Sequence, residues 1–178
     1  MNDAPDSNQN APAIDLNAED LAQIALDFVQ NGKTLSDLYH LSEENLETIY
    51  SVGYGMYASG GYAQANKIFE FLCFFDHLEK KHWLGLGACR QMLKHYEQAI
   101  EAYTYVTLID FGDPQPPLLA ADCHLALGNR DAAISALTAT IEWSGDRPEY
   151  AALRERATGL LDLVNASPAP AAESSAQP

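Results

Sequence analysis

The stretch WLGLGACRQMLKHYEQAIEAY, residues 83–103, has the apolar spacing of amphipathic helix but contains two glycines, Gly85 and Gly87. A glycine inside a helix costs about 1 kcal/mol relative to alanine. Helix propensity therefore does not explain this pair, and the reason has to lie in how the segment packs against the rest of the chain.

A repeat of fixed length runs through the middle of the chain and includes this stretch. Four columns of residues recur every 34 residues in three successive units: Ala65, Ala99 and Ala133; Phe69, Tyr103 and Leu137; Gly53, Gly87 and Ala121; Val52, Leu86 and Ala120. A 34-residue period with small residues at two set places is typical of the tetratricopeptide repeat, a helix–turn–helix unit. The sequence therefore predicts an all-α fold, a superhelical array of three tetratricopeptide helix pairs with an N-terminal helix and a C-terminal capping helix.

Close packing within each pair explains one of the two glycines. The small residues of the first helix are expected to meet those of the second where the helix axes come nearest, and these repeat-packing residues are Gly53, Ala65, Gly87, Ala99, Ala121 and Ala133. The cost of Gly87 is then offset by its large neighbours, each worth about 1.5–3 kcal/mol when fully buried. Gly85 lies outside this column, and we expect it to relieve crowding with the neighbouring repeat or beside a groove.

The composition of the two ends differs from that of the middle. Residues 1–15 and 167–178 are rich in Pro, Ala, Ser and amide or acidic residues, which predicts disordered tails. Residues 16–41 form a predicted N-terminal helical segment, with a helix over about 18–30 that Asn17 caps. Its apolar stripe of Leu21, Ile24 and Phe28 is a candidate dimerisation surface.

Residues 42–166 are predicted to hold the repeats, at about 46–79, 80–113 and 114–147, and then the capping helix. Ser42, followed by two acidic residues, is expected to begin the first helix of repeat one. Pro148 and Glu149 are expected to begin the capping helix. Its apolar positions would cover the exposed side of repeat three: Leu153, Leu160, Leu161 and Val164.

Charge and motif content exclude several classes of function. Ten Lys and Arg against 25 Asp and Glu give a formal net charge of −15, which opposes direct binding to nucleic acid. The sequence contains neither an apolar run of about 18 residues nor the order of a signal peptide, so we expect a cytoplasmic protein without membrane insertion. The three cysteines and five histidines lack ligand or catalytic spacing, which predicts no metal, no cofactor and no enzymatic activity.

The first helix of each pair should line the concave face of such an array, so binding residues are expected there. In repeat one this face carries Tyr50, Tyr54 and Tyr57, and the matching positions in repeats two and three are Leu84, Ala88, Gln91, Leu118, Asp122 and Leu125. An aromatic stripe at helical spacing is more often core than binding surface. Here Ile49, Val52, Gly53 and Met56 are assigned to the core of this helix, which leaves the tyrosines for a peptide-binding groove.

Three segments carry a resemblance to a known family: LSEENLETIYSVGYGMYASGGYAQANKIFEFLCFFDH (residues 41–77), WLGLGACRQ (residues 83–91) and DPQPPLLAADCHLALG (residues 113–128). Over about residues 18–165 the chain resembles the class II chaperones of bacterial type III secretion, the translocator chaperones of the SycD, LcrH and IpgC kind. The resemblance implies a small acidic cytoplasmic chaperone for two hydrophobic, pore-forming translocators. It implies that the concave groove takes an extended Pro-x-Leu-x-x-Pro segment, that members often dimerise through the N-terminal helix, and that some also bind an AraC-type transcription activator.

Two other binding functions remain open from the residues alone. A generic tetratricopeptide adaptor for the charged C-terminus of a heat-shock chaperone would need a basic clamp on the inner face, where this chain has Tyr50, Tyr54, Gln115 and Leu119. A regulatory module that binds a partner protein, such as a transcription activator, would use the same groove as a translocator chaperone.

Overall fold

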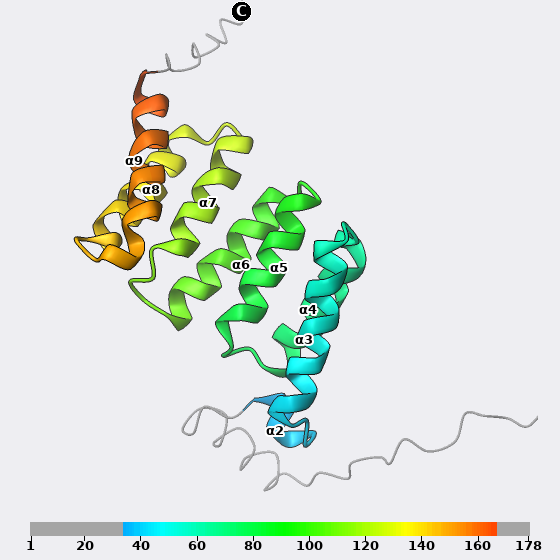
Figure 1. Ribbon diagram of the computed structural model, residues 1–178. Coiled ribbons are helices and arrows are strands. Elements are labelled where there is room, and N and C mark those ends of the chain that lie inside the picture. The colour runs from blue at the N-terminus through cyan, green and yellow to red at the C-terminus, as the bar shows by residue number, and fades with distance from the viewer. Residues whose placement is uncertain (1–33, 167–178) are drawn as a thin grey trace, which may run out of the picture. The chain divides into compact units, whose positions relative to one another are not determined.

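The computed structural model describes residues 34–166, and within them every regular element is a helix (Figure 1). The elements are α2 (Leu35–Leu38), α3 (Glu43–Ala58), α4 (Tyr62–Phe75), α5 (Lys80–Met92), α6 (Tyr96–Ile109), α7 (Gln115–Ala126), α8 (Arg130–Ser144), the 3-10 turn η1 (Pro148–Tyr150) and α9 (Ala151–Ala166). The predictions for both tails, for the helix over 18–30 and for Leu21, Ile24 and Phe28 lie outside the described residues.

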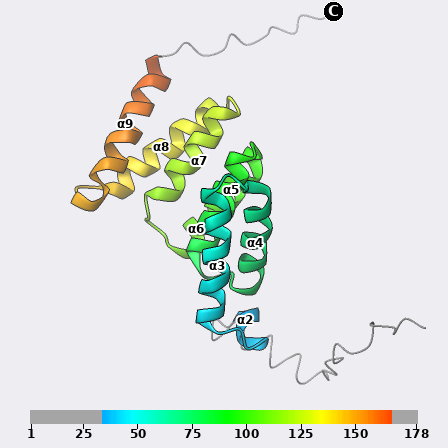
Figure 2. The same cartoon turned by 45° about the vertical axis from the view of Figure 1, so that its right-hand side comes forward.

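The helices from α3 onward pack in chain order, each against the next. The pairs α3 and α4, α5 and α6, and α7 and α8 are the three repeats, and α9 packs on α8 at the C-terminal end (Figures 1 and 2). The predicted all-α class with three tetratricopeptide helix pairs is thereby confirmed. Among residues 34–166, no helix has both the length and the apolar character needed to cross a bilayer.

Local sequence signals set the helix ends. Ser42 is the N-cap of α3, and its hydroxyl accepts a hydrogen bond from the Asn45 backbone N–H at 3.2 Å, while the Asn45 side chain accepts one from the Ser42 backbone. The three turns inside the repeats each contain a residue of positive φ: Gly60 at 84°, Lys94 at 63° and Gly128 at 74°. These turns recur with the 34-residue period, so the left-handed turn is part of the repeat.

The packing column occupies the interior of each pair. Ala65, Ala99, Ala121 and Ala133 are fully buried, and Gly53 and Gly87 are also buried. The close neighbour of Gly87 is, however, an aromatic ring. A Cβ at this position would lie nearer than 3.0 Å to the Tyr103 side chain. Gly87 thus makes room for Tyr103, the large residue one turn after Ala99, as well as allowing the close approach of the helices.

The assignment of Val52 to the core was wrong. Val52 is 48% exposed, although its equivalents in the later repeats, Leu86 and Ala120, are buried. Leu86 packs in a cluster with Phe69 and Leu72 of α4, the second helix of the preceding repeat. Among the described residues no such helix precedes α3, so the same column has no neighbour to cover it in repeat one.

The C-terminal helix covers repeat three as the sequence predicted. Leu118 and Leu137 form a buried cluster with Ala157 of α9. The predicted covering residues pack against this cluster: Leu153, Leu160, Leu161 and Val164. Arg156 of α9 also forms an ion pair with Asp122 of α7 at 2.7 Å. Helix α9 begins directly after the 3-10 turn Pro148–Tyr150. Proline suits the first position of this turn, because the backbone N–H that it lacks would have no partner within the turn.

Candidate groove for an extended peptide

A cavity of about 430 Å³ opens on the face formed by the first helices of the repeats, α3, α5 and α7. Most of the predicted groove residues line it: Tyr50, Tyr54, Tyr57, Leu84, Ala88 and Gln91. The three from α5 lie 34 residues after the three from α3, so both sets occupy the same positions of the repeat. The register of the repeat therefore brings together side chains that lie far apart in the sequence.

Three tyrosines of α3 form one wall of the groove. Tyr54 is 59% exposed, and its ring stacks against that of Tyr50 with centroids 6.5 Å apart. Tyr50 and Tyr57 are half-buried and also pack against the core of repeat one. Burial raises the pKa of the Tyr50 and Tyr57 hydroxyls, which keeps both uncharged. Tyr50 and Tyr57 thus belong both to the core and to the groove, whereas Tyr54 contributes to the groove alone.

Gly85 and Phe69 form part of the groove floor. A Cβ on Gly85 would lie nearer than 3.0 Å to the Phe69 ring, which comes from α4 of the preceding repeat. The same ring meets Tyr50 edge-on, with centroids 5.7 Å apart. Gly85 therefore relieves crowding with the neighbouring repeat beside the groove, as expected from its place outside the packing column.

Two polar groups of the groove, the Tyr103 hydroxyl and the Lys81 ammonium, have definite partners. The Tyr103 hydroxyl donates a hydrogen bond of 2.8 Å to Oε1 of Gln91. Lys81 pairs with Glu47 at 2.5 Å, and its Nζ lies 5.1 Å from the centre of the Tyr50 ring. Lys81, the one lysine among the described residues that lines the cavity, is thus neutralised by a carboxylate.

The third repeat departs from the predicted groove. Leu118 is 1% exposed and belongs to the core that α9 closes, so its assignment to the groove was wrong. Asp122 and Leu125 also do not line the cavity, and the Asp122 carboxylate is paired with Arg156. Gln115 and Leu119 of α7 contribute instead. Helix α9 takes Leu118 into the core and engages Asp122 through Arg156, and the groove uses neighbouring positions of α7.

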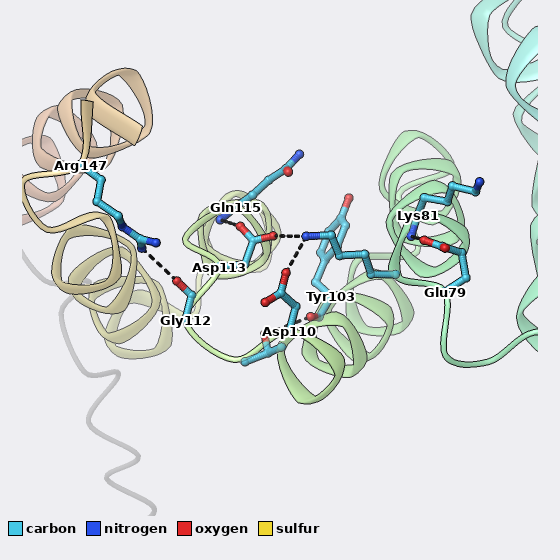
Figure 3. A network of polar contacts seen from close by, with 10 residues as sticks. Glu79, Lys81, Tyr103, Asp110, Gly112, Asp113, Gln115 and Arg147 are labelled. Carbon is cyan, nitrogen blue, oxygen red and sulfur yellow. Dashed lines mark hydrogen bonds and ion pairs between the residues drawn. The ribbon is translucent and has the colours of Figure 1, made fainter. Parts of the chain in front are cut away.

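The loop before α7 sets the position of Gln115. Lys80 Nζ lies 2.6 Å from Asp110 Oδ2 and 3.1 Å from Asp113 Oδ2. The buried Asp113 accepts a hydrogen bond of 2.9 Å from the Gln115 backbone N–H, which begins the helix (Figure 3). On the other side of the loop, Arg147 donates to the Gly112 carbonyl at 3.3 Å (Figure 3). Both neighbouring repeats therefore anchor this end of the groove.

The cysteines play a packing role in the core. Cys73, Cys89 and Cys123 are buried free thiols. Burial raises the pKa of Cys73 to about 12 and the pKa of Cys89 and Cys123 to about 11, so thiolate is scarce near neutral pH. Within residues 34–166 no three His, Cys, Asp or Glu side chains are grouped to hold a metal ion.

Some residues that line the groove were not predicted from the sequence, among them Phe69, Met92 and Tyr103. Phe69 and Tyr103 occupy one column of the repeat, which the sequence marked as recurring every 34 residues but did not place in the groove. The signal that points to the groove is the adjacent glycine in each case, Gly85 for Phe69 and Gly87 for Tyr103. Because glycine has no Cβ, a ring that packs on it can extend past the helix to the concave face.

Comparison with known proteins gives a consistent assignment. Tetratricopeptide repeat family models match residues 46–77 and 91–157. The chain is 37% identical to the low calcium response locus protein H of Yersinia pseudotuberculosis over 143 residues, 80% of this chain and 85% of the relative.

Two solved structures agree with this relationship. The crystal structure of PcrH in complex with the chaperone binding region of PopD is similar with a TM-score of 0.68 and 43% identity, over 71% of this chain and 95% of that one. The type III secretion translocator chaperone SycD of Yersinia enterocolitica, in an alternative dimer, is similar with a TM-score of 0.67 and 36% identity, over 70% and 95% of the two chains. This chain therefore belongs to the translocator chaperones of bacterial type III secretion, a family built from tetratricopeptide repeats.

Proposed function

We propose that the groove of this chain binds an extended segment of a hydrophobic type III translocator and keeps that client soluble and competent for secretion until export. The observation that carries the proposal is the aromatic and apolar groove across α3, α5 and α7. It is supported by the family relationship and by the PcrH relative, whose structure contains the chaperone binding region of PopD.

The chemistry of the groove suits such a client. Apolar side chains from a Pro-x-Leu-x-x-Pro segment would be removed from water against tyrosine rings and Leu84, which stabilises the complex in proportion to the apolar area buried. The net charge of −15 lies on the chaperone and keeps the complex dispersed while the apolar segment is covered. We expect this to take place in the bacterial cytoplasm, before secretion.

The groove offers a carboxylate ligand little charge to bind. Lys81 is paired with Glu47, and the other end of the cavity presents Gln115 and Leu119. A charged C-terminus would therefore lose its water without gaining an ion pair, which argues against the heat-shock adaptor function. A regulatory partner such as a transcription activator would compete for the same groove, and identification of the proteins that co-purify separates the two.

A charge placed at Tyr54 tests the proposal. Tyr54 is largely exposed, so Tyr54→Asp should leave the helical circular dichroism and melting temperature close to those of the unmodified protein, whereas Tyr50 is too deeply packed for this purpose. In the complex the new carboxylate would be desolvated against apolar side chains, so binding should weaken strongly. The measurement is fluorescence polarisation with a labelled peptide of the PopD chaperone binding region, and co-expression with the chain's own translocators gives the solubility readout.

Leu108→Asp is the matched control. Leu108 is 75% exposed and does not line the cavity, so the same charge there should leave binding unchanged. Equal binding by Tyr54→Asp and by the control would place the client on another face and remove the groove from the proposal.

A further inference from the structure

We propose that Gln91 recognises the main chain of the groove's occupant, with its side-chain N–H groups donating to a backbone carbonyl of the extended segment and with Tyr103 as the positioning residue. This inference rests on the proposed function, because it concerns a peptide in the same groove. It adds a polar determinant to a surface that otherwise selects for apolar side chains.

The orientation of the Gln91 amide is set by Tyr103. The Tyr103 hydroxyl donates to Oε1 of Gln91 at 2.8 Å, so the carbonyl branch of the amide is turned toward α6. Oε1 and Nε2 are the two branches of one planar, trigonal amide, so the nitrogen points away from the Tyr103 hydroxyl. Gln91 lines the cavity, and among the described residues Nε2 has no hydrogen-bond partner. Its two N–H groups are left for an occupant.

Tyr103 is rigid enough for this role. It is 1% exposed, and its ring lies on Gly87, where a Cβ would collide with it. Burial raises the pKa of the Tyr103 hydroxyl well above its ordinary value, so the group keeps its proton and remains a donor. The 34-residue column that places a ring at Phe69 places a ring with a hydroxyl here, and that hydroxyl reaches the groove.

An extended segment needs such a donor. Binding in an apolar groove removes water from the segment's backbone carbonyls, and each carbonyl left without a partner weakens the complex. Lys81 is engaged by Glu47 and lies over the Tyr50 ring, and Gln115 is exposed at the rim. Gln91 combines contact with the cavity and a side-chain amide oriented by a second residue. With Oε1 engaged by Tyr103, the group that it presents to an occupant is Nε2, which donates and so favours a carbonyl at that point.

Three substitutions measured with the PopD chaperone binding region test the inference. Gln91→Met keeps the length of the side chain but removes the donor, and we expect binding about tenfold weaker, the effect of one lost hydrogen bond in a dry site. Gln91→Glu keeps the acceptor for Tyr103 and sets a carboxylate against the carbonyl, so it should weaken binding more. Tyr103→Phe frees the amide to rotate and should weaken binding less than Gln91→Met. Gln98→Met, an exposed glutamine of α6 outside the groove, is the matched control and should bind as the unmodified protein does.

Ester substitution in the peptide provides a readout that a structural role would not change. Replacing a single backbone amide of the PopD peptide by an ester weakens its carbonyl as an acceptor and also removes its N–H. At one ester position the loss of binding should be larger for the unmodified protein than for Gln91→Met, and this difference isolates the carbonyl that Gln91 contacts. Equal binding by Gln91→Met and the unmodified protein, or the same ester profile in both, would overturn the inference. Failure of the unmodified protein to bind the peptide at all would instead count against the proposed function.

Discussion

Gly85→Ala offers the sharpest test of how the repeats pack beside the groove. Two opposing effects act at this position. Alanine stabilises a helix by about 1 kcal/mol relative to glycine. Against this, the new Cβ would lie nearer than 3.0 Å to the Phe69 ring, well inside the contact distance of about 3.5–4.0 Å between carbons.

The Phe69 ring has little room to move. It is buried among Leu72 and Leu86 and meets Tyr50 edge-on. Forcing an extra carbon into such a core costs about 1–3 kcal/mol, so the net change in the free energy of unfolding should be a loss of up to about 2 kcal/mol. At about 4 °C per kcal/mol the melting temperature should fall by several degrees. Urea and thermal unfolding followed by circular dichroism measure both quantities.

Gly55→Ala is the matched control for helix propensity. Gly55 lies inside α3 and is exposed, and a Cβ there would meet nothing within 4 Å, so alanine should stabilise the protein by about 0.5–1 kcal/mol. The difference between the two variants isolates the collision with Phe69. If Gly85→Ala proves as stable as Gly55→Ala, the packing of Phe69 under Gly85 is not as described, and the account of this glycine fails.

Four further predictions follow from the same structure. Ala99→Leu should separate α5 from α6 and lower the stability of the whole repeat domain in one transition by about 1–3 kcal/mol, whereas melting equal to the unmodified protein would contradict the packing column. Lys94→Gly should stabilise the protein by about 0.5–1 kcal/mol in urea unfolding, because Lys94 has a φ of 63° that glycine adopts freely, and a loss of stability would refute this. Burial lowers the pKa of His82 below its ordinary value of 6.5, so the unfolded chain takes up this proton first and the stability should fall as the pH drops below about 6.5. His82→Gln should therefore reduce the slope of the free energy of unfolding against pH between about pH 7.5 and 5.5. An unchanged slope would exclude His82 as the source of the pH dependence. Residues 18–39 should contribute to a weak homodimer, so light scattering should show a mass that rises with concentration and returns to the monomer value on deletion of residues 1–39. A mass that the deletion leaves unchanged would contradict this prediction.

The sequence by itself determined the repeat fold and much of the groove. The 34-residue period and the small residues at Gly87 and Ala99 required closely packed helix pairs, because only small side chains allow such an approach. The tyrosines of α3 and the matching positions of α5 followed from the same period, since equivalent positions of successive repeats face the same side. Local signals such as Ser42 and Pro148 marked where helices begin.

The tertiary structure alone decided the ends of the array and the floor of the groove. A periodic pattern assumes that every repeat has the same neighbours, and the terminal repeats do not. Val52 is exposed because no described helix covers it, and Leu118 is buried because α9 does. The role of Gly85 was likewise decided by a ring from another repeat, Phe69. Burial depends on what lies across the interface, and the period of one helix carries no information about that side.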